Sequence, residues 1–222
     1  PIGDYIKNLQ TGALIDLMAI NASFVDFSPD GSKVLLRSST ALVAGDTNGV
    51  NDLYVLDIAN GSYARVTSGL NGEQSTQAVF SSGGFSADGA KVSFVMFDNN
   101  LAGTDTNLAY DIYVKDLVTG AVSRVTDPAG GGQSNGSSFN PALSADGTKM
   151  LFTSSAGNLG GNTLSGSLLV KDQSTGAITV VNSTNEPGIT LYQQVSGFTF
   201  SPDGSKVLFK LSDNGGAWTR LY

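Results

Sequence analysis

Two loops of the sequence carry the same spacing of oxygen-bearing side chains. One reads Asp-Thr-Asn-Gly-Val-Asn-Asp and the other Asp-Thr-Asn-Leu-Ala-Tyr-Asp, so both have the form Asp-x-Asn-x-x-x-Asp. Calcium is a hard cation that takes about seven oxygen ligands from carboxylates, amide and backbone carbonyls, and water. The spacing therefore predicts a calcium site in each loop, and the predicted metal ligands are Asp46, Asn48, Asp52, Asp105, Asn107 and Asp111.

The same residues have a second interpretation that needs no metal. Asp and Asn side chains hydrogen-bond to their own backbone and so favour turns, and the final Asp of each motif stands where a strand is expected to begin. The motif also lacks the glutamate of an EF-hand loop. The aligned positions of the third and fourth repeats described below hold no such ligand set: they are Gly161, Thr163 and Ser167, and Asn214, Gly216 and Arg220. Both interpretations stay open.

The residues that are absent exclude whole classes of chemistry. The 222 residues include no histidine and no cysteine, which excludes a Ser-His-Asp or Cys-His nucleophile, a His- or Cys-ligated zinc site and thiol redox chemistry within this chain. Only two of the nineteen acidic residues are glutamates, and a glycosidase needs two placed carboxylates. We therefore expect no catalytic residues and no cofactor other than calcium. A hydrolase or lyase that uses carboxylates alone is the least favoured alternative.

Charge and hydropathy narrow the class of partner. Twelve basic and nineteen acidic residues give a net charge of −7, so nucleic acid and anionic membranes are unfavourable partners. No run of eighteen apolar residues is present, and we expect no membrane insertion. The chain begins at Pro1 rather than Met, as expected for a processed mature form or an excised segment.

A repeated segment predicts the fold. The sequence Phe-Ser-Pro-Asp-Gly-Ser-Lys at 27–33 recurs three times in close variants, and its aspartates Asp30, Asp88, Asp146 and Asp203 are 58, 58 and 57 residues apart. In each repeat an apolar run precedes the Asp-Gly turn, a second run follows it, and a third run ends in a further turn before a fourth. Four short antiparallel strands per repeat predict the blades of an all-β propeller. A solenoid of four-stranded units is the alternative.

The ends of the chain bear on how the ring closes. We expect a single domain, 1–222, with blades at approximately 23–68, 79–126, 138–182 and 195–222, the last completed by the N-terminal strands within 1–21. Joining the two ends in one blade removes the exposed strand edges of an open arc. A four-blade ring closed within one chain is therefore expected. The alternatives are an eight-blade ring of two chains, strand donation between subunits, and a piece of a larger propeller.

The aspartate that ends the third run has its own expected role. It occurs as Asp57, Asp116 and Asp172, and Asn8 has the same place near the N-terminus. We expect each side chain to hydrogen-bond the adjacent turn and hold its hairpin together.

These motifs resemble a known repeat. The Ser-Pro-Asp-Gly-Ser-Lys turn, the Leu-Tyr-Val-x-Asp strand and the Thr-Gly turn before Arg-Val-Thr resemble the TolB-like propeller repeat, a WD40-like repeat also called PD40. The resemblance covers nearly the whole chain. It implies a bacterial protein of the periplasm, the cell surface or the extracellular space, in which a non-catalytic scaffold mediates protein binding, adhesion or assembly. The family also includes gating domains appended to peptidases, but no peptidase domain is present here.

The aromatic residues suggest one further ligand class. Tyr54 and Tyr113 repeat in register and are expected to pack between blades. The other aromatic residues of polar segments offer a stacking platform for sugars, so a glycan is the alternative partner beside a protein partner or self-assembly through the terminal strands. They are Trp218, Tyr222, Tyr192, Tyr110 and Tyr63.

Overall fold

The computed structural model describes residues 4–97, 101–160, 166–182, 193–213 and 216–221. The regular secondary structure of this part of the chain is β-strand, apart from one short 3₁₀ turn, η1 (Gly157–Leu159). None of its helical segments has the length and hydropathy that a membrane crossing needs.

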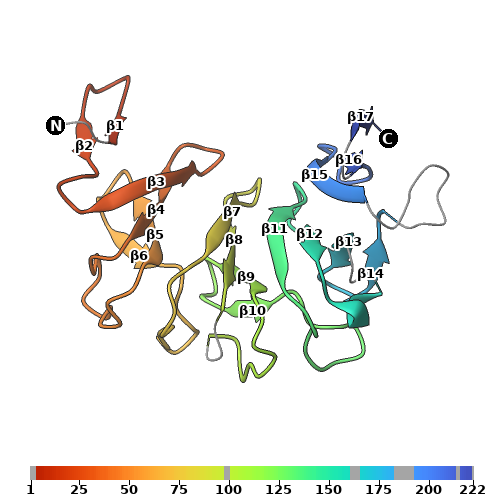
Figure 1. The fold of residues 1–222 in the computed structure, drawn as a ribbon. Coiled ribbons are helices and arrows are strands. Elements are labelled where there is room, and N and C mark those ends of the chain that lie inside the picture. The colour runs from red at the N-terminus through yellow and green to blue at the C-terminus, as the bar shows by residue number, and fades with distance from the viewer. Residues whose placement is uncertain (1–3, 98–100, 161–165, 183–192, 214–215, 222) are drawn as a thin grey trace.

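Three four-stranded antiparallel sheets stand side by side as successive blades of an arc (Figure 1). Within each sheet the strands follow one another in chain order, which is the arrangement of a propeller blade. The first blade contains β3 (Ala22–Phe27), β4 (Lys33–Ser38), β5 (Asp52–Asp57) and β6 (Tyr63–Arg65). The second contains β7 (Ser81–Phe85), β8 (Lys91–Met96), β9 (Asp111–Asp116) and β10 (Val122–Arg124). The third contains β11 (Ser138–Leu143), β12 (Lys149–Ser154), β13 (Ser167–Asp172) and β14 (Ile178–Val180).

The repeated Asp-Gly segment forms the turn between the first two strands of each blade. In the first blade Asp30 accepts hydrogen bonds from the hydroxyl of Ser28 at 2.7 Å and the backbone N–H of Ser32 at 3.0 Å. Gly31 has a φ of +69°, a conformation that favours glycine. The corresponding aspartates of the later repeats, Asp88, Asp146 and Asp203, accept the same pair of bonds. The predicted structural turn is confirmed.

The lysine that ends this motif links neighbouring blades. Nζ of Lys91 donates to the carbonyl oxygen of Gly147 in the turn of the next blade at 3.3 Å, and Lys149 donates to Gly204 at 3.1 Å. In these two blades the motif both turns the chain and connects one turn to the next, whereas Nζ of Lys33 and of Lys206 donates to the serine beside it in its own turn.

The aspartates that end the third strands hold the outer hairpins, as predicted. Oδ1 of Asp57 accepts the backbone N–H groups of Ala59 and Asn60 at 2.9 and 3.2 Å. Asp116, Asp172 and Asn8 do the same for their own turns.

The core lies between the faces of neighbouring blades. Strands β5, β8 and β9 each have a run of five buried residues and β4 has a run of three, because each middle strand is covered on both faces. Leu35 and Leu53 of the first blade pack with Phe94 and Tyr113 of the second, whose rings stack at 5.7 Å. Tyr54 is also fully buried. The expectation that Tyr113 packs between blades is thereby confirmed.

The innermost strands touch one another at β-bulges. Each strand of this kind has a register shift at the same place, at Phe24/Asp26 in β3 and at Ser82/Gly84 in β7. The carboxylate of Asp26 accepts the backbone N–H of Phe85 across the blade boundary at 3.2 Å. At Gly83 the backbone of the next inner strand comes so close that a Cβ would overlap the carbonyl oxygen of Pro141.

The two ends of the chain form partial blades. An N-terminal hairpin of β1 (Tyr5–Lys7) and β2 (Leu14–Asp16) forms a two-stranded sheet, and β15 (Gln193–Phe200), β16 (Val207–Asp213) and β17 (Gly216–Leu221) form a three-stranded sheet. These sheets lie at opposite ends of the arc (Figure 1). The all-β propeller class is confirmed, but the prediction that the N-terminal strands complete the terminal blade does not match the pairing of the described strands.

The reason for this difference is local. The short connector 17–21 holds the hairpin directly against the first blade. The backbone N–H of Leu17 donates to the carbonyl oxygen of Asp4, and the carbonyl oxygen of Leu17 accepts the N–H of Ala22. Ile6 and Leu17 are buried with Val34 of the first blade. This packing holds the hairpin at the start of the arc.

Candidate functional site

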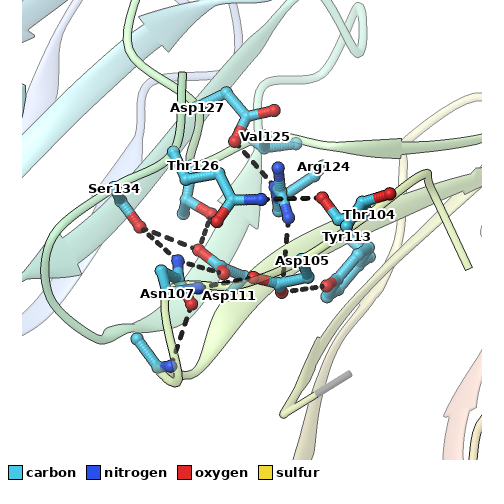
Figure 2. A network of polar contacts seen from close by, with 12 residues as sticks. Thr104, Asp105, Asn107, Asp111, Tyr113, Arg124, Val125, Thr126, Asp127 and Ser134 are labelled. Atoms are coloured by element: carbon cyan, nitrogen blue, oxygen red, sulfur yellow. Dashed lines mark hydrogen bonds and ion pairs between the residues drawn. The ribbon is translucent and has the colours of Figure 1, made fainter. Parts of the chain in front are cut away.

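The loop between β8 and β9 is held by a buried network of polar side chains (Figure 2). Asp105 accepts a hydrogen bond from the hydroxyl of Tyr113 on β9 at 3.1 Å and pairs with Nη1 of Arg124 on β10 at 3.3 Å. Nε of the same arginine donates to Asp127 at 2.7 Å. The side chains of both Asp105 and Arg124 are more than nine-tenths buried, so this ion pair is shielded from solvent.

A second buried carboxylate closes the loop from its other end. Asp111, the first residue of β9, is fully buried and accepts hydrogen bonds from Asn107 Nδ2 at 2.8 Å and from the hydroxyls of Ser134 and Thr126. The amide oxygen of Asn107 accepts the backbone N–H of Ala109 at 2.9 Å. Asn107 thus joins the loop backbone to the start of the strand.

The first blade repeats this arrangement. Asp46 contacts the hydroxyl of Tyr54 and pairs with Nη1 of Arg65 at 3.2 Å. Asp52 accepts Nδ2 of Asn48 at 2.9 Å, and it also contacts the hydroxyl of Thr67. The structure therefore brings the six predicted ligands together in two groups of three, as the sequence spacing indicates.

Burial governs the protonation of these groups. Desolvation raises the pKa of Asp52 and of Asp111, and the hydrogen bonds from the neighbouring threonine and asparagine partly oppose it. Desolvation also raises the pKa of Tyr113 above its ordinary value. The tyrosine accordingly remains a neutral donor to its aspartate.

The donor set gives a measure of how well calcium fits. A guanidinium already lies beside Asp46 and beside Asp105, and Asp52 and Asp111 are surrounded by hydroxyl and amide donors. Among the described residues there is no group of three or more acidic side chains that could hold a metal ion. Calcium at either loop stays a prediction. The arginine beside each aspartate competes with a metal ion for that carboxylate.

Sequence reasoning missed the tyrosine, arginine and threonine of these networks. The sequence does contain a signal for them, because the two blades repeat the same sequence separations. Asp46 is followed by Tyr54, Arg65 and Thr67. Asp105 is followed at the same numbers of residues by Tyr113, Arg124 and Thr126.

The third blade has other residues at the aspartate, tyrosine and arginine positions of this polar network. Ser167 stands in place of the strand aspartate, and the tyrosine and arginine positions hold Leu169 and Val180, which pack in an apolar cluster. The residues change together, as the members of one structural network do.

Beside the second network the loop presents a leucine to solvent. Leu108 is 82% exposed and has a φ of +54°, where the equivalent residue of the first blade is Gly49 with a φ of +71°. It borders a small cavity of about 70 Å³, together with Thr76, Gln77, Phe97, Asp105, Asn107 and Ala109. A left-handed backbone is unfavourable for leucine by about 1 to 2 kcal/mol, so the network holds this residue in a conformation it would not adopt by itself.

The structure describes two of the five aromatic side chains expected to form a sugar platform, and these two lie in different blades. Tyr63 packs partly buried on β6 beside the N-terminal hairpin, and Tyr110 lies partly buried just before β9. Tyr192, Tyr222 and the side chain of Trp218 lie outside the described residues. Tyr63 and Tyr110 therefore do not form one platform with each other.

Comparison with known proteins adds information on the fold. No family model matches the chain. No curated protein matches it either. The match to solved structures is extensive. Over 98% of this chain, TolB from Acinetobacter baumannii is 19% identical with a TM-score of 0.56, and over 88% a putative TolB from Agrobacterium tumefaciens is 18% identical with a TM-score of 0.53.

The fold is that of a TolB-like β-propeller. The β-propeller domain of the Trilobed protease from Pyrococcus furiosus, described as having an open velcro topology, is similar over 90% of this chain at 12% identity and a TM-score of 0.50. The propeller described here spans 44%, 58% and 52% of these three chains.

Proposed function

We propose that this propeller is a non-catalytic scaffold that binds a protein partner or further copies of itself, in the periplasm, at the surface or in the surroundings of a bacterial cell. Its likeness in fold to TolB structures supports the proposal. The terminal strands are a second contact surface in this proposal, since β1 has only β2 as a strand partner among the described residues.

The observation that carries the proposal is the presentation of Leu108. This apolar side chain is 82% exposed. Its loop is held rigid by the hydrogen bonds and the ion pair of Asp105, Asn107 and Asp111. A rigid loop loses little conformational entropy on binding, and an exposed apolar residue next to a cavity offers area to bury. The strained backbone is compatible with selection for contact rather than for stability.

The state of the carboxylates supports the non-catalytic part. The turn aspartates are occupied by serine hydroxyls and backbone N–H groups, and the aspartates of the two networks by arginine, tyrosine, threonine and asparagine. A glycoside hydrolase needs an acid and a base that both reach substrate. In the described networks these groups serve the structure.

The test uses Leu108→Gly, which removes the side chain and relieves the backbone. The immobilised chain is incubated with envelope and secreted proteins of its source bacterium, and bound proteins are quantified by mass spectrometry. We expect the wild-type chain to retain a partner in near-stoichiometric amount and L108G to retain at least tenfold less, with a melting temperature no lower than that of the wild type.

Leu70→Ala is the matched control, because Leu70 is 65% exposed on the connector that leaves the first blade. It should bind as the wild type does. Equal retention by all three proteins would overturn the role of Leu108. Turnover of a polysaccharide or peptide substrate by the purified chain, abolished in Asp105→Asn, would overturn the non-catalytic assignment.

A further inference from the structure

Three aromatic rings cluster at the junction of the second and third blades. Phe80 stands just before β7, Tyr110 just before β9, and Phe139 on β11. The ring centroids are 4.9 Å apart for Phe80 and Tyr110, and 5.5 Å apart for each of the other two pairs. Phe80 is 52% exposed, so the group presents an aromatic face to solvent. We refer to these three residues as the aromatic platform.

The repeat does not require these aromatic residues. Phe80 is the fifth residue before Phe85, and the same position holds Ala22 in the first blade and Ser138 in the third. Both of those blades form with a small residue there.

The other two platform positions show the same contrast. Phe139 corresponds to Ser23 and Ser81, and Tyr110 corresponds to Asn51. The platform is therefore particular to one junction. Tyr110 and Phe139 also pack, partly buried, against the apolar cluster of the second and third blades, and Phe80 leaves half of its surface exposed for a ligand.

A polar hollow adjoins the platform. It has a volume of about 220 Å³ and its described lining is Ser137, Phe139, Asn140, Thr153, Ser154, Ser155, Gly166 and Val195. Asn140 has a φ of +56° and its Nδ2 donates to the hydroxyl of Thr153 at 3.2 Å. Phe139 is thus shared by the platform and by a hollow that hydroxyl- and amide-bearing residues line.

This pairing of surfaces selects a chemical class. A pyranose ring has an apolar C–H face that stacks on an aromatic ring and a rim of hydroxyls that hydrogen-bond to hydroxyl and amide side chains.

Charge decides between neutral and acidic sugars. The described lining of the hollow carries no charged side chain, and the chain has a net charge of −7, which disfavours an acidic ligand. Next to Phe80, the guanidinium of Arg37 is engaged by the carbonyl oxygen of Val79 at 2.7 Å.

We propose that the aromatic platform and the adjoining hollow form a binding site for a chain of neutral hexoses. The rings bind one sugar face, and the side chains of Asn140, Thr153 and Ser155 lie where they can bond the hydroxyl rim of the same or the next sugar. The proposal goes beyond the scaffold function because it assigns a sugar ligand to the three rings and the hollow, none of which includes Leu108, although Tyr110 stands on the same β8–β9 loop as that leucine.

The test is titration calorimetry of the full chain with cellohexaose, laminarihexaose, maltohexaose and mannohexaose, and with trigalacturonate as the acidic probe. We expect at least one neutral hexaose to bind and trigalacturonate not to bind. Phe80→Ala should weaken binding at least tenfold with an unchanged melting temperature, because alanine is the residue of the first blade at this position. Thr153→Val should weaken sugar binding only through the loss of a hydrogen bond to the hydroxyl rim of the sugar. Leu70→Ala and Leu108→Gly should bind as the wild type does.

Four results would overturn the proposal: no neutral hexaose binds, F80A binds as tightly as the wild type, trigalacturonate binds in preference, or a proline-rich peptide displaces the sugar with higher affinity. The function proposed for Leu108 is judged separately, because L108G changes protein capture and F80A changes sugar binding.

Discussion

The ammonium group of Lys115, on the third strand of the second blade, donates a hydrogen bond to the carbonyl oxygen of Ser68, in the connector that leaves the first blade, at 2.7 Å. It also donates to Gly120 at 2.8 Å. Lys171 does the same one blade further on, reaching the carbonyl oxygens of Val125 and Asp127 at 2.8 and 2.6 Å. Both lysines are over nine-tenths buried, and each joins its blade to the preceding one.

Replacing Lys115 should weaken the contact between the first and second blades. Lys115→Met keeps the length of the side chain but leaves two carbonyl oxygens without this donor, which we expect to destabilise the chain by about 1.5 to 3 kcal/mol. Chemical denaturation followed by circular dichroism measures the change. Lys7→Met is the matched control, since Lys7 has the same register in the N-terminal hairpin but is exposed. Equal losses in both variants would show that this contact contributes nothing.

The turn aspartates should make stability depend on pH in acid. Hydrogen bonds from the hydroxyl of Ser144 and the N–H of Thr148 hold the pKa of Asp146 at about 2, below its ordinary 3.8. A folded-state pKa below the unfolded one gives stability that is fully present above the unfolded value and is lost as the pH falls through the folded value. We therefore expect the melting temperature to drop between pH 4 and pH 2.

Asp146→Asn isolates the contribution of one turn. Its difference in melting temperature from the wild type should be largest at pH 5 to 7 and should shrink toward pH 2. The buried Asp52 and Asp111 have raised pKa values and act in the opposite direction, but they are the same in both proteins. A difference that stays constant over this range would contradict the assignment.

Gly83 should tolerate no side chain. A Cβ at this position would overlap the carbonyl oxygen of Pro141 on the next inner strand, so we expect Gly83→Ala to cost about 1 to 3 kcal/mol through overpacking. Gly130→Ala is the control, because Gly130 has open space around its Cβ position and no positive φ. Thermal melting of the two variants side by side decides the point, and equal melting temperatures would refute the close contact.

Removing Arg65 tests whether calcium can take the place of the guanidinium beside Asp46. With Arg65 in place at 3.2 Å, we expect the same melting temperature in 2 mM calcium and in excess chelator. Arg65→Ala should lower it, since it leaves a buried carboxylate without its partner, and calcium should then restore part of the loss. A calcium response of the wild-type chain, abolished in Asp46→Asn, would instead support the calcium site predicted from the sequence.

Local patterns were sufficient to predict the blades. The Asp-Gly turns and the aspartates that end the third strands recur at fixed spacing, and their hydrogen bonds involve residues within five positions of each other. Such contacts depend on local sequence alone, which is why Asp30 and Asp57 have the roles that the sequence indicates.

Long-range contacts explain what was not predicted. The partners of Asp46 include Arg65, nineteen residues away in the sequence, and the bond from Lys115 to Ser68 spans 47 residues. The aromatic platform is formed by rings from two blades whose proximity depends on how the blades stack. The position of the N-terminal hairpin likewise depends on the burial of Leu17, which no periodicity reveals.

The contact between inner strands has a consequence for the shape of the whole arc. Neighbouring blades meet at their innermost strands, with Gly83 against Pro141 and the carboxylate of Asp26 against the backbone of Phe85, so the side chains at the bulges limit how closely two blades approach there. A larger residue there keeps the two inner strands further apart, whereas a glycine lets them approach each other. These inner contacts contribute to the curvature of the array, together with the apolar packing between the middle strands of neighbouring blades.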